Sequence, residues 1–174
     1  MNIDVNPSNI CLYFKITLKI LSEILIMENI LISACLLGVA CRYDGCRKPL
    51  PAPAIEKLQQ QYHLIPICPE IMGGLSTPRL PSEIQPNRTV MRSDGADVTE
   101  NYQRGAQEAL QLAELFHCKL AILKEKSPSC GSGKIYDGSF SKTLTEGDGI
   151  TSELFKKNGI LIIGESEVLK QTII

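Results

Sequence analysis

Four short apolar runs, separated by amphipathic stretches, constrain the fold of this chain more than any other feature. Each run is rich in Ile and Leu and is bounded by Pro, Gly or Ser, which is typical of strands buried in a parallel sheet. The runs cover residues 30–34, 63–67, 119–123 and 159–163. Alternation of such strands with helices is the pattern of βαβ units. The sequence therefore predicts an α/β fold, a single-domain three-layer α/β/α arrangement with a mostly parallel sheet.

Three amphipathic stretches between these runs predict helices. They cover residues 54–62, 99–117 and 150–157. The longest stretch places Tyr102 on its apolar face. Two long segments, 69–96 and 125–149, are predicted to be loops because they are rich in Pro or Gly. Loops of this length in a compact domain are usually functional.

The first 26 residues differ in composition from the rest of the chain, being rich in Asn and Ile. No apolar run in them approaches the ~18 residues that a membrane span requires. Neither the basic segment nor the cleavage site of a signal peptide is present. Met27 directly precedes the first predicted strand and would serve as a translation start. We therefore expect residues 1–26 to be a peripheral N-terminal extension that need not belong to the natural protein, residues 27–174 to form the α/β domain, and the protein to be cytoplasmic.

The charge of the chain argues against some classes of partner. It carries 18 Lys and Arg residues against 19 Asp and Glu residues, a net charge of −1. Binding to nucleic-acid duplexes depends on neutralising phosphates with Lys and Arg, and this balance supplies no basic field. We expect the protein to bind neither nucleic-acid duplexes nor membranes.

Seven cysteines, an odd number, stand in a sequence without an export signal. Such cysteines are expected to be reduced thiols, which serve as metal ligands, as catalytic groups or as small buried apolar side chains. We assign Cys11 and Cys118 to the last class, because each lies in an apolar or helix-end context without a loop motif.

Three other cysteines each follow the end of a predicted strand. Cys35 and Cys68 come directly after the first and second runs, and Cys130 follows the third run after a short loop. The carboxyl ends of parallel strands share one edge of a sheet, and ligands bind in the crevice outside that edge. We therefore expect these three thiols, which are far apart in sequence, to meet there.

Three convergent thiolates without an obvious fourth ligand suit a [4Fe–4S] cluster that leaves one iron open. Soft thiolates favour iron–sulfur clusters, Cu(I) or zinc. Zinc is the alternative, but structural zinc has four ligands, usually in closely spaced pairs. Neither His63 nor His117 stands at a ligand spacing. The residues therefore predict an iron–sulfur centre, with zinc as its competitor.

These segments together resemble the DUF523 family, whose characterised members are thiouracil desulfidases. The resemblance covers about residues 28–165 and depends on several short motifs. The motifs are residues 30–38, CRYDG at 41–45, CPE at 68–70 with GGL at 73–75, TPR at 77–79, DVT at 97–99, SPSCG at 127–131 and GDG at 147–149. The N-terminal extension and Cys46 depart from the family's pattern.

The resemblance implies a [4Fe–4S] cluster on Cys35, Cys68 and Cys130. Its open iron would bind the sulfur of a small thio-substituted substrate, a thiolated pyrimidine base or nucleoside. Iron would act as a Lewis acid while water attacks the ring carbon, a carboxylate accepts the water proton and sulfide leaves. Glu70, two residues after a proposed ligand, is the candidate general base. Ser127 is the candidate hydroxyl for proton transfer.

Several other residues in these motifs have more than one interpretation. Ser129 is a second, weaker candidate for the hydroxyl. Arg79 and Lys134 would steady the charge of the substrate or the cluster, or would simply be solvated. Cys41 and Cys46 form a C-x₄-C pair, which would be a redox pair, a transient sulfur acceptor or two inert thiols.

The function expected from the sequence is an iron–sulfur-dependent hydrolase that removes sulfur from a thiolated pyrimidine and releases sulfide. The alternative is a non-catalytic iron–sulfur or zinc protein, such as a sensor or an accessory module. Glu70 beside Cys68 favours the enzyme. A thiol-redox protein is disfavoured because no CxxC motif opens a helix. The sequence leaves open the physiological substrate, the fate of the sulfur and the oligomeric state.

Overall fold

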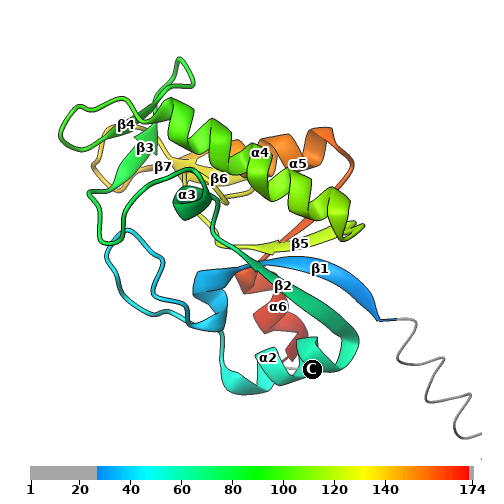
Figure 1. The fold of residues 1–174 in the computed structure, drawn as a ribbon. Coiled ribbons are helices and arrows are strands. Elements are labelled where there is room, and N and C mark those ends of the chain that lie inside the picture. Colours follow the sequence, from blue (N-terminus) through cyan, green and yellow to red (C-terminus); the bar gives the residue numbers. More distant parts are fainter. Residues whose placement is uncertain (1–26, 173–174) are drawn as a thin grey trace, which may run out of the picture.

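A four-stranded parallel sheet forms the centre of the protein (Figure 1). Its strands are β1 (Glu28–Ser33), β2 (Tyr62–Ile67), β5 (Leu120–Leu123) and β8 (Leu161–Gly164), in the order β2-β1-β5-β8. All neighbouring strands run parallel. The four predicted runs are confirmed as parallel strands, with ends that differ from the prediction by one or two residues.

This computed structural model describes residues 27–172. The predicted extension over residues 1–26, with Cys11, lies outside that range, so the proposed domain division stays a prediction. Within residues 27–172, no helix is long and apolar enough to cross a membrane.

Helices cover both faces of the sheet, which confirms the three-layer α/β/α arrangement (Figure 1). One layer holds α2 (Ala52–Gln61) and α6 (Glu165–Thr172), and the opposite layer holds α4 (Thr99–Leu115) and α5 (Ile150–Lys157). Side chains alternate along β1. Ile30 and Ile32 join the apolar core on the side of α2, whereas Leu31 joins the core that includes Ala109 of α4. The three predicted helices are thus confirmed, and α6 is an additional one.

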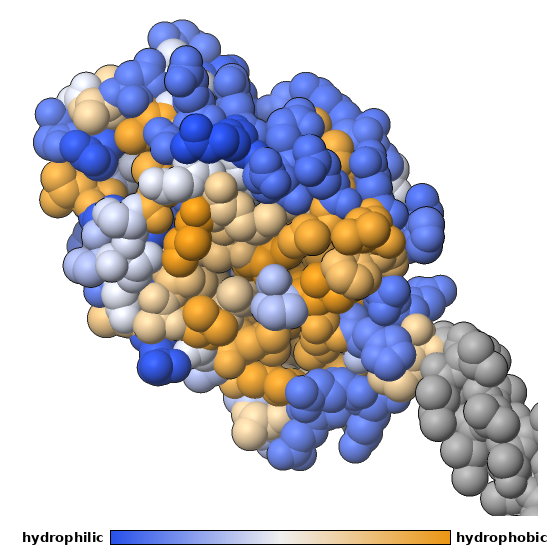
Figure 2. Space-filling view, in the orientation of Figure 1, coloured by the Kyte–Doolittle hydropathy of each residue, from blue (hydrophilic) through white to orange (hydrophobic). Residues whose placement is uncertain are grey.

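Helix α4 is amphipathic, as its sequence predicts. Its residues Tyr102, Ala106 and Ala109 are buried, whereas Gln103 and Gln107 are exposed. Figure 2 shows hydrophilic side chains over the outer face of this helix and hydrophobic ones gathered below it, towards the edge of the sheet where β2 is the outer strand.

The two segments predicted to be long loops contain short regular elements, which corrects that expectation. Residues 69–96 include helix α3 (Pro69–Met72) and the antiparallel pair β3 (Ser82–Ile84) and β4 (Val90–Arg92). Residues 125–149 include the antiparallel pair β6 (Lys134–Tyr136) and β7 (Leu144–Glu146). Elements of three or four residues are too short to show a hydrophobic period in the sequence.

Helix α3 lies against α4 at two glycines, and this contact positions the segment that follows β2. A Cβ atom on Gly105 would lie 1.8 Å from the carbonyl oxygen of Pro69. A Cβ atom on Gly73 would lie 2.0 Å from the carbonyl oxygen of Asn101. The Asn101 side-chain amide also donates a hydrogen bond of 2.8 Å to the Gly73 carbonyl. The backbones of the two helices therefore touch, and only glycine leaves the necessary space.

We expect Gly105→Ala to destabilise the protein. Alanine favours a helix over glycine by about 1 kcal/mol, but its methyl group would overlap the Pro69 carbonyl, and such overpacking typically costs about 1–3 kcal/mol. Urea denaturation followed by circular dichroism should show a lower free energy of unfolding. The control is Gln107→Ala on the exposed face of the same helix, which should change that free energy by no more than about 0.5 kcal/mol. A Gly105→Ala protein as stable as this control would show that the α3–α4 contact is not tight.

Candidate functional site

A cavity of about 680 Å³ opens beside the carboxyl ends of β1, β2 and β5, and the three strand-end cysteines line it. Cys35 lies in a short 3₁₀ helix, η1 (Ala34–Leu37), directly after β1. Cys68 directly follows β2 and precedes α3, and Cys130 lies in the loop after β5. The structure therefore brings together the three cysteines that the sequence singled out. Their role as ligands stays a prediction.

The environment of Cys68 and Cys130 favours the neutral thiol in the protein chain alone. Burial raises the pKa of the Cys130 thiol to about 12, although the hydroxyls of Ser33 and Ser129 act in the opposite direction. The neighbouring thiol of Cys41, and after it burial, raises the pKa of the Cys68 thiol. Thiolate is the form that binds metals, so loading such a site releases protons.

The donor set at the cavity fits a sulfur-bound cluster better than a single metal ion. The strand-end donors are all thiols, and the two histidines, His63 and His117, lie on the exposed surface. Among residues 27–172, no three His, Cys, Asp or Glu side chains are grouped as the ligands of one metal ion. The three thiols come from three separate segments that line the cavity. A polynuclear cluster suits such a donor set, because each thiolate binds a different iron.

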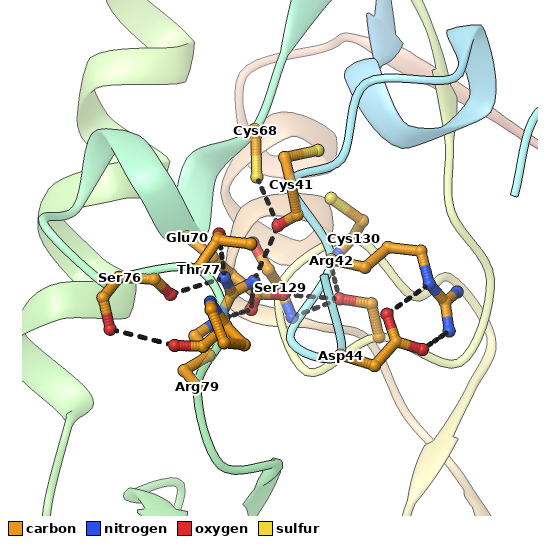
Figure 3. A network of polar contacts seen from close by, with 12 residues as sticks. Cys41, Arg42, Asp44, Cys68, Glu70, Ser76, Thr77, Arg79, Ser129 and Cys130 are labelled. Carbon is orange, nitrogen blue, oxygen red and sulfur yellow. Dashed lines mark hydrogen bonds and ion pairs between the residues drawn. The ribbon is translucent and has the colours of Figure 1, made fainter. Parts of the chain in front are cut away.

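A fourth thiol, that of Cys41, whose role the sequence left open, also lies in this cavity. Cys41 is only 3% exposed and lines the cavity, and its thiol interacts with the thiols of both Cys35 and Cys68. Figure 3 shows it beside Cys68. Its C-x₄-C partner Cys46 is exposed, and both are free thiols. Cys118 is buried in the core, as predicted for a small apolar side chain.

Glu70, the predicted general base, lies in the first turn of α3 and forms an ion pair with Arg79 (Figure 3). The Arg79 Nε donates to Oε2 of Glu70 at 2.9 Å, and Nη2 donates to the same oxygen. Both side chains are mostly buried, with 6% of Arg79 and 14% of Glu70 exposed. The sequence left open whether Arg79 is simply solvated at the surface, and its burial in this ion pair shows that it is not. Lys134, in contrast, is exposed.

Ser127 faces the other oxygen of Glu70. Its hydroxyl donates to Oε1 of Glu70 at 3.3 Å and accepts hydrogen bonds from the backbone N–H groups of Ser129 and Cys130 at 3.1 and 3.2 Å. A hydroxyl has two acceptor lone pairs and one proton. Because both lone pairs are occupied, the proton is directed at the carboxylate. The hydroxyl of Ser129 points elsewhere, to Oγ1 of Thr151 at 2.9 Å.

Tyr102 is a further residue at this carboxylate. Its position on the apolar face of α4 was predicted, but its partner was not. The side chain is buried and its hydroxyl interacts with Ser82 and Glu70. Burial raises the pKa of this phenol, and the negative charge of Glu70 adds to the effect. Tyr102 is therefore a neutral group beside the carboxylate.

Comparisons with known proteins find relatives in sequence and in fold. The sequence model of the family described as 2-thiouracil desulfurase matches residues 30–167. The chain is 40% identical over 148 residues to the uncharacterized protein YbbK of Bacillus subtilis (strain 168), a match that covers 80% of this chain and 97% of that protein. A solved structure of the [4Fe-4S]-dependent thiouracil desulfidase TudS (DUF523Vcz) is also 40% identical, with a TM-score of 0.76 and coverage of 84% of this chain and 99% of that one. Residues 30–167, the range that the family model matches, include every site residue described above.

We predict that the three strand-end cysteines in this cavity, Cys35, Cys68 and Cys130, hold iron. Anaerobically prepared protein should be brown and contain about four irons per chain. Replacing Cys35, Cys68 or Cys130 by Ser should abolish the absorption of the cluster and the bound iron. Replacing the exposed Cys46 by Ser should change neither. Iron and sulfide analysis with absorption spectra measures this, and a colourless protein with one tightly bound zinc would contradict it.

Proposed function

Because this chain belongs to the 2-thiouracil desulfurase family, we propose that it is a [4Fe–4S]-dependent hydrolase that removes sulfur from a thiolated pyrimidine base or nucleoside. The reaction exchanges sulfur for oxygen without a change of oxidation state. A thiocarbonyl and water give a carbonyl and hydrogen sulfide. The alternative of a non-catalytic iron–sulfur or zinc protein finds no support in these relatives.

The observation that carries the proposal is that a hydrogen-bonded carboxylate and hydroxyl, the candidate acid–base pair, lie in the same cavity as the thiols. Glu70 and Ser127 line the same cavity as Cys35, Cys68 and Cys130. A cluster held by those three thiolates would supply an open iron as a Lewis acid for the substrate sulfur. A carboxylate and a hydroxyl within hydrogen-bond reach of each other are the groups that general acid–base catalysis uses.

Glu70 is suited to accept the proton of the attacking water. Its Oε2 is occupied by Arg79, which holds the carboxylate in one orientation. Its Oε1 accepts a hydrogen bond from the neutral hydroxyl of Ser127. This oxygen has a second lone pair, so it can also bind the water and take its proton.

Ser127 is suited to pass a proton to the departing sulfur. Once Glu70 has taken the water proton, it no longer attracts the hydroxyl proton of Ser127 as a carboxylate does. As that hydroxyl proton passes to the sulfur, the Ser127 oxygen gains the lone pair that accepts the proton from Glu70. Tyr43, Tyr136 and Phe140 line the same cavity and offer flat surfaces against which a pyrimidine ring can pack.

Replacing Glu70 by Gln tests the general base. Gln keeps the size and most of the hydrogen bonding of Glu but does not accept the proton, so the cluster should assemble while turnover is lost. Removal of a general base typically slows a reaction about 10²- to 10⁴-fold, or roughly 3–5 kcal/mol of barrier. Sulfide release from 2-thiouracil and a spectral titration with the same compound should be measured on one cluster-replete sample.

The control for this variant is Glu108→Gln on the exposed face of α4, which should retain full activity. Full activity of Glu70→Gln would assign the base to another group. If the unmodified protein neither binds nor converts any thio-pyrimidine, the enzymatic function itself is wrong.

Ser127 and Ser129 form a matched pair for the hydroxyl. Ser127→Ala should lower turnover by roughly 10²-fold through loss of proton transfer. Ser129→Ala should leave turnover unchanged, and loss of its buried hydrogen bond to Thr151 should instead lower the free energy of unfolding by about 1 kcal/mol. Steady-state kinetics and urea denaturation of both variants measure this. The opposite pattern would make Ser129 the proton-transfer residue.

A further inference from the structure

Glu83 is a buried carboxylate at the cavity that the mechanism described above does not use. It lies in β3, lines the cavity and is 8% exposed. Unlike Glu70, it forms no ion pair with any Lys or Arg within residues 27–172. Burying a carboxylate is costly unless hydrogen bonds replace the lost water. Its hydrogen bonds therefore determine what it contributes to the site.

One oxygen of Glu83, Oε2, holds the turn between β6 and β7. It accepts hydrogen bonds from the backbone N–H groups of Gly138 at 3.0 Å and Phe140 at 2.9 Å. The side-chain amide of Gln85, two residues further on, donates to the Gly138 carbonyl at 3.0 Å. A glutamine at position 83 would offer an equivalent oxygen to the two N–H groups. Holding the turn therefore does not by itself account for a carboxylate here.

The other oxygen, Oε1, accepts no hydrogen bond from any group of residues 27–172, yet it is not sealed inside the protein. In that range no fully buried side-chain nitrogen or oxygen lacks a hydrogen-bond partner, so an unbonded Oε1 must be accessible. Glu83 lines the cavity, which is therefore the space that reaches this atom. Glu70 and Glu165, two other carboxylates of the cavity, have both oxygens in hydrogen bonds. Oε1 of Glu83 is thus an acceptor open to a ligand.

Resting on the proposed function, we propose that Glu83 selects the pyrimidine, because its Oε1 accepts a hydrogen bond from the ring N3–H group of a thiouracil-type substrate. N3–H is the ring N–H group that stays free when N1 carries a sugar. It is also next to both ring carbons, C2 and C4, that can carry the sulfur. A thiocytosine has no hydrogen on N3, so its lone pair faces the lone pairs of Oε1. Glu83 therefore favours thiouracil over thiocytosine compounds.

The turn that Glu83 holds also carries an aromatic side chain of the cavity. Phe140 lines the cavity, and its backbone N–H is bound to Oε2 of Glu83. Its φ of 58° is in the left-handed region, which a bulky residue rarely adopts and which is over-represented at ligand-binding sites. A flat surface for the pyrimidine ring and an acceptor for its N–H group therefore belong to the same part of the cavity.

Glu83→Gln tests this selection. The glutamine oxygen can keep both bonds to the turn, which leaves its NH₂ group, a donor, at the position of Oε1. The two probes are 1-methyl-2-thiouracil, whose N3 carries a hydrogen, and 1-methyl-2-thiocytosine, whose N3 is an acceptor. The unmodified protein should convert the first with a kcat/KM at least about 10²-fold higher, because a site that binds a substrate N–H group rejects an analogue without it. In Glu83→Gln this preference should fall at least about tenfold.

The matched control is Gln85→Ala, which removes the other side-chain bond to the same turn and leaves the Glu83 carboxylate in place. It should keep the preference of the unmodified protein. Apparent Kd values from spectral titrations with the two compounds should show the same pattern without turnover. An equal loss of preference in Gln85→Ala would assign the effect to the turn instead of Oε1 and would overturn the proposal.

These measurements also separate this inference from the proposed function. If the unmodified protein converts both compounds equally well, it is a desulfidase and only the selection by Glu83 is wrong. If it converts no thio-pyrimidine at all, both are wrong. If Glu83→Gln does not fold, the unmodified protein decides, since a preference of about 10²-fold for the thiouracil supports the inference and a ratio near one overturns it.

Discussion

The central position of β1 is the constraint on which the rest of the site depends. β1 pairs in parallel with β2 on one side and β5 on the other, so three strands end at the same edge. Its residues Ile30, Leu31 and Ile32 are fully buried between the two helical layers, which leaves no freedom to shift the register without exposing apolar surface. Because Cys35, Cys68 and the Cys130 loop continue from these strand ends, the sheet register sets the spacing of the thiols.

Arg79 connects several segments that lie outside the central sheet. Its donors reach Glu70 on α3, the carbonyl of Ser76, the hydroxyl of Thr77 and the carbonyl of Cys41. A mostly buried guanidinium and carboxylate stabilise each other only as a pair, and removing one partner of such a pair typically costs about 3–5 kcal/mol. The same ion pair therefore holds the candidate base in one orientation, and the other bonds of Arg79 connect two loops around the cavity.

The sequence predicted the strands and long helices, which have a hydrophobic period, and left open the roles of several residues in segments without one. Strands and long helices carry a hydrophobic period, and the strand-end rule then predicted that Cys35, Cys68 and Cys130 meet. Cys41 and Arg79 lie in segments without a period, where only the folded path of the chain decides which way a side chain points. Tyr102 shows what the hydrophobic period of a helix does not predict. The pattern predicted that its side chain is buried, but not that its hydroxyl interacts with Glu70.

Ser127 couples the geometry of a proposed ligand to the proton chemistry. Its oxygen binds the backbone N–H groups of Ser129 and Cys130, which shapes the loop that presents the Cys130 thiol. Because those two bonds use both lone pairs, they also orient the hydroxyl proton towards Glu70. A loop conformation that places the Cys130 thiol in the cavity therefore directs the proton at the carboxylate as well. One hydroxyl therefore serves both functions. Its lone pairs accept the bonds that shape the loop, and its proton is donated to Glu70.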